Sequence, residues 1–206
     1  MAFNPDEAAI VSLLKRERFF RDTSQWDKCR DEFHPDARKT FINVSWFQGD
    51  ADDFMKQSQR RPTVEQAIDI DHFIDPVLIQ VNGNRAISDS AIFITRAFDY
   101  SGHEYELGSR LRALSRFVKV DGEWKMLSLE AIYIRDRLIS TSPIAPKENI
   151  VLDEEKMAFP KEYRWTAWLM SIGGKVTPRN DLPRNGKIEE VRMMVERNER
   201  FLEDAS

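Results

Sequence analysis

The sequence predicts an α+β protein, in which a curved antiparallel sheet carries helices over its concave face and a helical extension follows. Three observations predict this class. Helical periodicity dominates residues 5–60, alternation of apolar and polar residues dominates residues 68–133, and the pattern changes again after residue 140. Long strands that share one core twist and bend, so helices lying across the hollow of such a sheet would leave a pocket.

The first 60 residues predict three helices and one strand. Asn4 is a capping residue, and the proline and acidic residues that follow it are typical of a first helical turn, so a helix is expected from residue 5 to about residue 20. A short helix is expected over residues 25–33 and a third over residues 51–60. A strand is expected around residues 39–44.

Four long strands are expected between residues 68 and 133. Tight-turn sequences separate them: Asn82-Gly83-Asn84, Tyr100-Ser101-Gly102 and Asp121-Gly122. Strands joined by such short turns must run antiparallel. Helices followed by a meander of strands define the α+β class.

The last third of the chain predicts an extension rather than a second domain. Residues 140–147 contain two prolines and are expected to form a linker. A helix is expected to begin at residues 160–165 and to end before two glycines, and a final helix with many charge pairs is expected over residues 188–202. We therefore divide the chain into a main domain, residues 1–139, and an extension, residues 140–206, that packs on the main domain or on a partner subunit.

Composition excludes several classes of function. The 206 residues are 41% hydrophobic and 32% charged, with a formal net charge of −4 and no basic stripe, so a nucleic-acid partner is not expected. No apolar run approaches the roughly 20 residues of a membrane span, and the N-terminus lacks the pattern of a secretory signal. The single Cys29 excludes an internal disulfide, and a cytoplasmic protein is expected.

One histidine occupies an apolar row. In the stretch DIDHFIDP the acids alternate to one side, while His72 falls on the other side with Ile68, Ile70 and Ile74. A buried imidazole needs hydrogen-bond partners. His72 is either a structural residue bonded to backbone or threonine, or half of an acid–base pair with Asp22 at the end of the first helix. Asp22 could alternatively cap the next helix.

Three segments carry a family resemblance: FFRDTSQWDKCRDEFHPDA, DHFIDP and FVKVDGEWKMLSLEAIYIRD. Their order resembles the SnoaL-like branch of the nuclear transport factor 2 superfamily, which includes polyketide cyclases, scytalone dehydratase and lindane dehydrochlorinase, over roughly residues 5–138. The resemblance implies a cone-shaped sheet with an internal pocket. It also implies that Asp22 and His72 act together on a substrate as a general base.

The resemblance has departures that concern the substrate. Positions that orient the substrate in the two enzymes hold different residue types in this chain: Arg21, Phe41, Thr95 or Arg96, Ala113 and Leu129. The proposed acid–base pair is kept, whereas the substrate-orienting groups are not. Neither enzyme's own substrate is therefore expected.

Six further side chains are candidates for substrate binding: Arg96, Trp26, Trp46, Phe41, Tyr133 and Ser109. Arg96 lies in a mostly apolar row and could hold a carboxylate or enolate oxygen, or could form a salt bridge at an interface. Tyr133 could donate its phenol proton or only pack, and Ser109 could simply be tolerated in the core. The aromatic residues could line the pocket mouth or belong to the core.

Three functions remain open. The first is a cofactor-free lyase, isomerase or cyclase acting on a small, largely apolar, aromatic or polyketide-like molecule. The second is a non-catalytic β subunit of an aromatic-ring-hydroxylating dioxygenase, and the third is a small-ligand-binding module. A homodimer or homotrimer is expected. No metal is expected, because no histidine and cysteine spacing suggests a zinc site. No nucleotide-phosphate site is expected either, because no glycine-rich phosphate loop is present.

Overall fold

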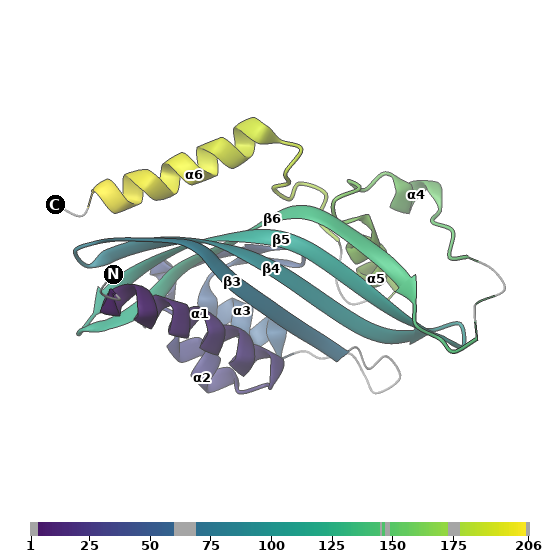
Figure 1. Cartoon of the computed structure of the whole chain (residues 1–206), viewed down its shortest axis with the longest axis horizontal. Coiled ribbons are helices and arrows are strands. Elements are labelled where there is room, and N and C mark those ends of the chain that lie inside the picture. The colour runs from purple at the N-terminus through teal and green to yellow at the C-terminus, as the bar shows by residue number, and fades with distance from the viewer. Residues whose placement is uncertain (1–3, 60–68, 145, 147–148, 173–177, 205–206) are drawn as a thin grey trace.

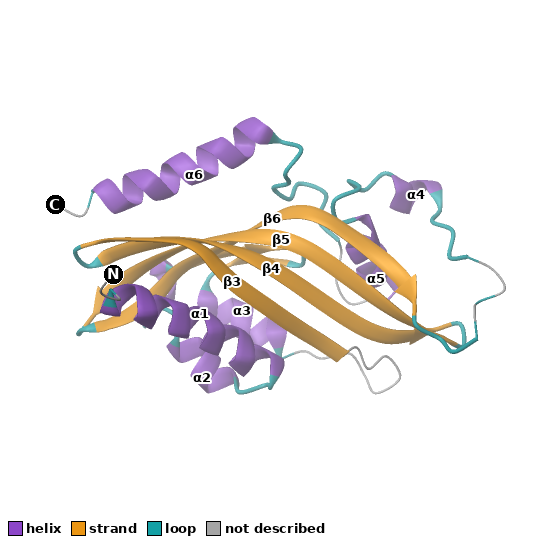
Figure 2. Cartoon of the chain, viewed as in Figure 1, coloured by secondary structure: helices purple, strands orange, loops and turns teal. Residues whose placement is uncertain are grey.

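The computed structural model describes residues 4–59, 69–144, 146, 149–172 and 178–204. It contains one curved, six-stranded sheet with helices on both faces (Figure 1). The elements follow the order helices, long strands, helices (Figure 2). The predicted α+β class, with a curved sheet and N-terminal helices over its concave face, is confirmed.

Three helices begin the chain, as the sequence predicts. They are α1 (Pro5–Asp22), α2 (Trp26–Asp31) and α3 (Ala51–Ser58). The side chain of Asn4 accepts the backbone N–H of Asp6 at 3.0 Å, which satisfies one of the free donors at the start of α1. α1 extends two residues beyond its predicted end, so its last residue is the aspartate of the proposed acid–base pair.

The sheet has the strand order β2-β1-β6-β5-β4-β3. Its strands are β1 (Phe41–Val44), β2 (Phe47–Gly49), β3 (Asp69–Asn82), β4 (Arg85–Tyr100), β5 (His103–Val120) and β6 (Glu123–Ser140). The early strand and the four long strands are confirmed, and the short β2 was not predicted. A 3-10 turn, η1 (Ala37–Lys39), occupies the predicted beginning of β1. β1 runs parallel to β6, whereas the long strands are antiparallel to one another.

The predicted turns join the long strands. At the turn between β4 and β5, Ser101 and Gly102 have φ angles of 51° and 77°. Asp121 and Gly122, between β5 and β6, have φ angles of 51° and 86°. Two consecutive positive φ angles match the turn type whose twist suits antiparallel strands, and this explains the choice of small or Asx-like residues there.

The main core lies between the concave face of the sheet and the first three helices. Leu13 and Leu14 of α1, Phe54 of α3 and Phe117 of β5 are each at most 1% exposed. Phe54 packs edge-on against Phe33 with ring centroids 6.4 Å apart. Apolar burial of this extent is the main favourable contribution to folding, and it fixes α1 across the sheet close to β3.

Three helices follow β6: α4 (Glu154–Met157), α5 (Arg164–Ile172) and α6 (Ile188–Glu203). α6 matches its prediction, whereas α4 was not predicted. α5 begins at residue 164 because residues 161–163 form a turn, and its predicted glycine end falls outside the described residues. In the described part of the chain, no helix combines the length and the apolar character needed to cross a membrane.

The C-terminal helices cover opposite faces of the sheet (Figure 1). α5 contacts Ser109 and Asp136, which lie directly opposite each other on β5 and β6 and belong to the concave face. α6 packs through Met194 against Leu114 and Ile132, on the convex face. The extension thus packs on the main domain within the same chain.

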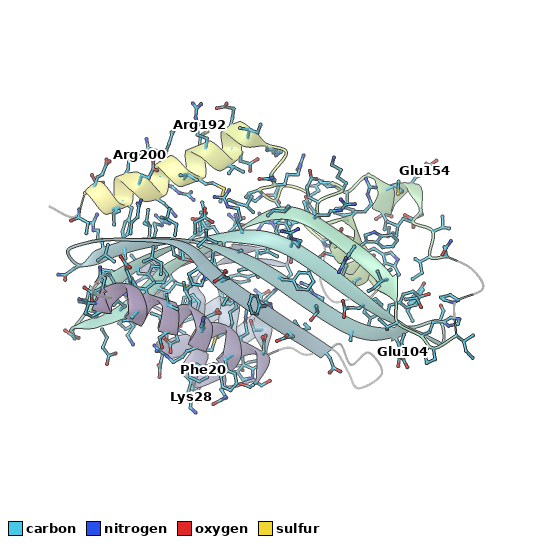
Figure 3. The ribbon with its side chains drawn as sticks, in the orientation of Figure 1. Phe20, Lys28, Glu104, Glu154, Arg192 and Arg200 are labelled. Carbon is cyan, nitrogen blue, oxygen red and sulfur yellow. The ribbon has the colours of Figure 1, made fainter. Side chains whose placement is uncertain are left out.

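α6 covers part of the convex face of the sheet. Arg197 of α6 donates from Nη2 to both carboxylate oxygens of Glu130 at 2.7 Å, and Glu130 is 2% exposed. A buried carboxylate needs such a partner. Arg192 and Arg200 point away from the sheet (Figure 3).

Residues 178–187 connect α5 to α6 along the edge of β6. The backbone N–H of Tyr133 donates to the carbonyl of Pro183 at 2.9 Å, and the N–H of Asn185 donates to the carbonyl of Tyr133 at 2.9 Å. Arg179 also donates to the side chain of Asn43 at 2.7 Å. The extension is therefore joined to the main domain by backbone pairing as well as by side-chain packing.

Candidate functional site

Asp22 and His72 are in direct contact. The Nδ1 atom of His72 lies 2.6 Å from Oδ1 of Asp22, and the backbone N–H of His72 donates to Oδ2 at 2.9 Å. Both carboxylate oxygens are thereby held by one residue, 50 positions away in the sequence. The alternative interpretation, in which Asp22 caps α2, is wrong, because α2 has no side-chain cap and Asp22 binds His72 instead.

The positions of the two residues follow from the elements that carry them. Asp22 is the last residue of α1, so its side chain leaves the helix where the helix crosses the edge of the sheet. His72 lies near the beginning of β3, opposite Ile94 of β4. Their side chains are only 13% and 17% exposed, for His72 and Asp22 respectively. A shielded pair of this kind keeps its geometry because water does not compete for the hydrogen bonds.

The contact with Asp22 fixes the tautomer of His72. An ionised carboxylate can only accept, so Nδ1 of a neutral His72 carries the proton and Nε2 is left as the basic nitrogen. Burial, together with the charges of Arg21 and Arg18, holds the pKa of His72 well below 6.5. Burial also raises the pKa of Asp22. At neutral pH the imidazole is therefore uncharged and able to accept a proton.

His72 lines a narrow cavity between the sheet and the helices. The cavity has a volume of about 40 Å³, which is room for about two or three water molecules. Apolar side chains form much of its wall: Val44, Trp46, Ile92, Ile94, Leu111 and Leu129. A ligand larger than a few atoms would have to displace a flexible side chain of the wall.

Three arginines also line the cavity. Arg18 is 3% exposed, and its Nη1 bonds to Glu17, which is fully buried. Arg21 reaches the same carboxylate, with its Nε 3.7 Å from Oε1. Arg96 approaches from β4 and donates from Nη1 to the hydroxyl of Ser109 at 3.0 Å. Burial lowers the pKa of Arg18 to about 10 and lowers that of Arg96, yet both remain charged at neutral pH.

The C-terminal extension completes the polar end of this site. The hydroxyl of Thr166 in α5 lies 3.1 Å from that of Ser109, which in turn contacts Arg96. The backbone N–H of Thr166 donates to Oδ2 of Asp136 at 2.6 Å. Burial raises the pKa of Asp136 to about 6. α5 thus supports Arg96 through a hydroxyl chain that residues 1–139 alone do not contain.

Tyr133 is the other titratable group of the wall. Its phenol oxygen accepts the backbone N–H of Ser45 at 2.7 Å, so its own proton is free to point elsewhere. Burial raises the pKa of Tyr133, which keeps the phenol protonated. A protonated phenol and a neutral imidazole thus line the same cavity, and they can serve as an acid and a base respectively.

Comparison with known proteins identifies the family. The family model described as "SnoaL-like domain" matches residues 4–130, which is more than half of the chain. The chain belongs to the SnoaL-like domain family. The match contains both Asp22 and His72 and ends within β6, before the helical extension begins.

Curated relatives extend the similarity of this SnoaL-like protein beyond the domain. "Pea pathogenicity protein 2" of Fusarium vanettenii is 26% identical over 188 residues, covering 87% of this chain and 77% of that protein. A PEP2-like protein of the same fungus is 25% identical over the same coverage. A match that covers 87% of the chain is longer than residues 1–139. Both matches therefore include part of the C-terminal extension.

Solved structures share the fold of this SnoaL-like domain. A putative scytalone dehydratase from Novosphingobium aromaticivorans has a TM-score of 0.51 at 17% identity, covering 68% of this chain and 89% of that one. A hexachlorocyclohexane dehydrochlorinase has a TM-score of 0.57 at 10% identity, covering 69% and 95%. At these identities the likeness shows the fold alone.

Not every predicted site residue of this SnoaL-like domain reaches the cavity. His72, Trp46, Arg96 and Tyr133 line it, and Asp22 and Ser109 contact His72 and Arg96 respectively. Two candidates do not line it: Trp26 and Phe41. Trp26 packs against the main core, and Phe41 begins β1 opposite Ser128 of β6. Trp26 was expected at the pocket mouth or in the core, and it packs in the core; Phe41 was a candidate through the family resemblance.

The buried charges of α1 were missed as a group. Ile10, Leu13 and Leu14 form the apolar face of the helix, and the helical repeat continues that face through Glu17 and Arg21. Two charges on an apolar register are a signal that the sequence does contain. It is the same signal that singled out His72 in β3.

Two further features of the described residues concern other chemistry. Cys29 is fully buried and its pKa is raised by burial, so it belongs to the core. Among residues 4–59, 69–144, 146, 149–172 and 178–204, no group of three or more histidines, cysteines or acids is arranged to hold a metal ion.

Proposed function

We propose that this protein is a cofactor-free lyase, isomerase or cyclase that uses the Asp22–His72 pair as a general base. The observation that carries the proposal is the 2.6 Å contact between Nδ1 of His72 and Oδ1 of Asp22 beside a cavity that His72 lines. Nε2 of His72 removes a proton from a carbon next to a carbonyl group of the substrate. Asp22 holds the tautomer and stabilises the imidazolium that forms.

The apolar wall supports a small, largely apolar substrate of aromatic or polyketide-like type. Trp46 and Leu111 line the cavity and can contact a flat ring once a flexible side chain of the wall has moved aside. Tyr133 is the proposed general acid, because its phenol stays protonated and its oxygen is held by the N–H of Ser45. A proton from Tyr133 would leave with a departing hydroxyl in a dehydration.

The test measures proton abstraction directly, without knowledge of the natural substrate. The probe is 2-tetralone, an aromatic ketone whose acidic C–H signals disappear in D₂O as exchange proceeds, followed by proton NMR. The protein is expected to accelerate exchange over buffer, and His72→Ala is expected to lower the enzymatic rate by about 10²–10⁴-fold, the usual contribution of a positioned base. Asp22→Asn is expected to cause a loss of similar size, because an amide can donate to Nδ1 and so select the wrong tautomer.

The matched control is His103→Ala. His103 is the first residue of β5, directly after a turn and remote from the cavity lining, so its removal should leave exchange unchanged. Circular dichroism and thermal unfolding establish that the variants remain folded. Exchange that is as fast in folded His72→Ala as in the unaltered protein would refute the role of the pair.

We also propose that the protein is a homodimer or homotrimer. Phe73 and Val77 on the edge strand β3 are 66% and 72% exposed, and such large apolar groups are usually covered in an assembly. Light scattering coupled to size exclusion measures the mass in solution. A mass equal to that of one chain at micromolar concentration would contradict the assembly.

A further inference from the structure

The guanidinium groups at the cavity have more hydrogen-bond donors than partners. Among the described residues, Arg96 uses one of its five donors, in the bond to Ser109. In the described part of the chain, no carboxylate oxygen lies within 4.0 Å of a guanidinium nitrogen of Arg96, so Arg96 has no ion pair there. The charge of Asp136 affects the pKa of Arg96 only from a longer distance. A charged side chain whose donors are left unused in a partly apolar wall costs free energy unless something else binds it.

Arg18 and Arg21 have the same surplus. The Nε atoms of both are buried and have no hydrogen-bond partner among the described residues. Among the residues that the structure describes, Glu17 is the one carboxylate in ion-pair contact with the two of them, through Nη1 of Arg18 and at 3.7 Å from Nε of Arg21. Two guanidinium groups from α1 and one from β4 therefore surround the cavity with a positive field that the nearby acids do not pair one to one.

We propose that the cavity binds a ligand with an apolar body and one carboxylate, and that Arg96 is the residue that binds the carboxylate. The proposal rests on the proposed function, since it names the class of substrate on which the Asp22–His72 pair acts. A guanidinium can bind a carboxylate with two parallel hydrogen bonds, which gives orientation as well as affinity. The apolar side chains of the cavity wall accept the rest of the molecule, and a flexible one among them must move aside for a body larger than a few atoms.

The register of the sheet sets the distance between the carboxylate and the reacting carbon. His72 pairs with Ile94, while Arg96 lies two residues further along β4 and on the same face. Such diagonal neighbours have Cα atoms roughly 7–8 Å apart. A carboxylate on Arg96 therefore leaves a body about the size of one ring or a few carbon atoms to reach Nε2 of His72.

Binding of an anion would also strengthen the base. The charges of Arg21, Arg18 and Arg96 all lower the pKa of His72, after burial itself. A bound carboxylate offsets part of that positive field, so His72 accepts a proton more readily with such a ligand present. The arginines would then favour reaction of an anionic molecule over that of a neutral one of the same shape.

The test compares benzoate with benzamide, which have the same shape and differ in charge. Isothermal titration calorimetry on the whole chain is expected to give at least about tenfold tighter binding of benzoate, because the charged hydrogen bonds are available only to the anion. Arg96→Met keeps the apolar stem and removes the charge, so it should weaken benzoate and leave benzamide unchanged. Arg96→Lys should restore part of the preference.

Arg110→Met is the matched control. Arg110 is exposed on β5, on the face opposite to Ser109, so its removal should not change either affinity. Three results would overturn the proposal. They are equal affinities for the two probes, no binding of benzoate at all, and an equal loss of affinity for both probes in folded Arg96→Met. His72→Ala distinguishes the proposed carboxylate site from the proposed general base. If the variant still prefers benzoate and still catalyses proton exchange at the unaltered rate, the carboxylate site is supported and only the role of His72 as the base is refuted.

Discussion

Asp136 makes the stability of the fold depend on pH, and an asparagine in its place would remove that dependence. The residue is 6% exposed, and its Oδ2 accepts the backbone N–H of Thr166 at 2.6 Å. Its Oδ1 has no hydrogen-bond partner among the described residues. Burial raises the pKa of Asp136 from the ordinary 3.8 to about 6, although the contact with Thr166 acts in the opposite direction.

The sign and the size follow from the pKa. Between pH 3.8 and about 6 the folded protein keeps a proton on Asp136 that the unfolded chain has lost. The stabilising effect is therefore fully present below pH 3.8 and is lost as the pH rises through about 6. A pKa raised from 3.8 to about 6 corresponds to about 3 kcal/mol, of which about 2 kcal/mol falls between about pH 4 and about pH 7.

The assay is urea unfolding of the unaltered protein and of Asp136→Asn, followed by tryptophan fluorescence across that pH range. Asparagine still accepts from Thr166 but cannot ionise. The free energy of unfolding of the variant, relative to the unaltered protein, should therefore rise by about 2 kcal/mol between about pH 4 and about pH 7. Asp71→Asn, at an exposed position of β3, should show no such rise. A difference between Asp136→Asn and the unaltered protein that does not change with pH would refute the reasoning.

The remaining predictions concern other buried groups. Because the pKa of His72 is lowered, the acidic limb of kcat/KM for proton exchange should lie below pH 6.5, and a limb above it would contradict the assignment of the base. Arg197→Met should destabilise the protein by about 1–3 kcal/mol in urea, because it removes the Nη2 group that donates to both oxygens of the buried Glu130, whereas Arg192→Met on the exposed side of α6 should be neutral. Cys29, buried and with a raised pKa, should react with thiol reagents only on unfolding; rapid reaction in the folded protein would disagree.

Much of the fold could be predicted from the sequence because local signals agreed with tertiary structure. The positive φ angles at Gly102 and Gly122 explain why the turn positions stood out, and the alternation between those turns explains the long strands. The parallel pairing of β1 with β6 could not be predicted in this way, since it joins residues far apart through backbone bonds. The short β2 and α4 carry too few residues for a period to be recognised.

The site was predictable where one residue disagreed with its surroundings. His72 interrupts an apolar row, and Asp22 lies at a helix end, so each could be selected by position. Their contact, however, depends on the crossing of α1 over the sheet edge. The role of Thr166 beside Ser109 could not be predicted, because nothing in the sequence of α5 indicates which face of the sheet it covers.

The hydroxyl chain from Thr166 to Arg96 makes the site modular. The acid–base pair belongs to α1 and β3, while the support of the arginine comes from a helix added after the sheet is complete. On the proposed function, changes in α5 would therefore alter which molecule Arg96 binds without altering the histidine that takes its proton. Exchange of this helix between relatives, or its redesign, would be a route to new selectivity on an unchanged reaction centre.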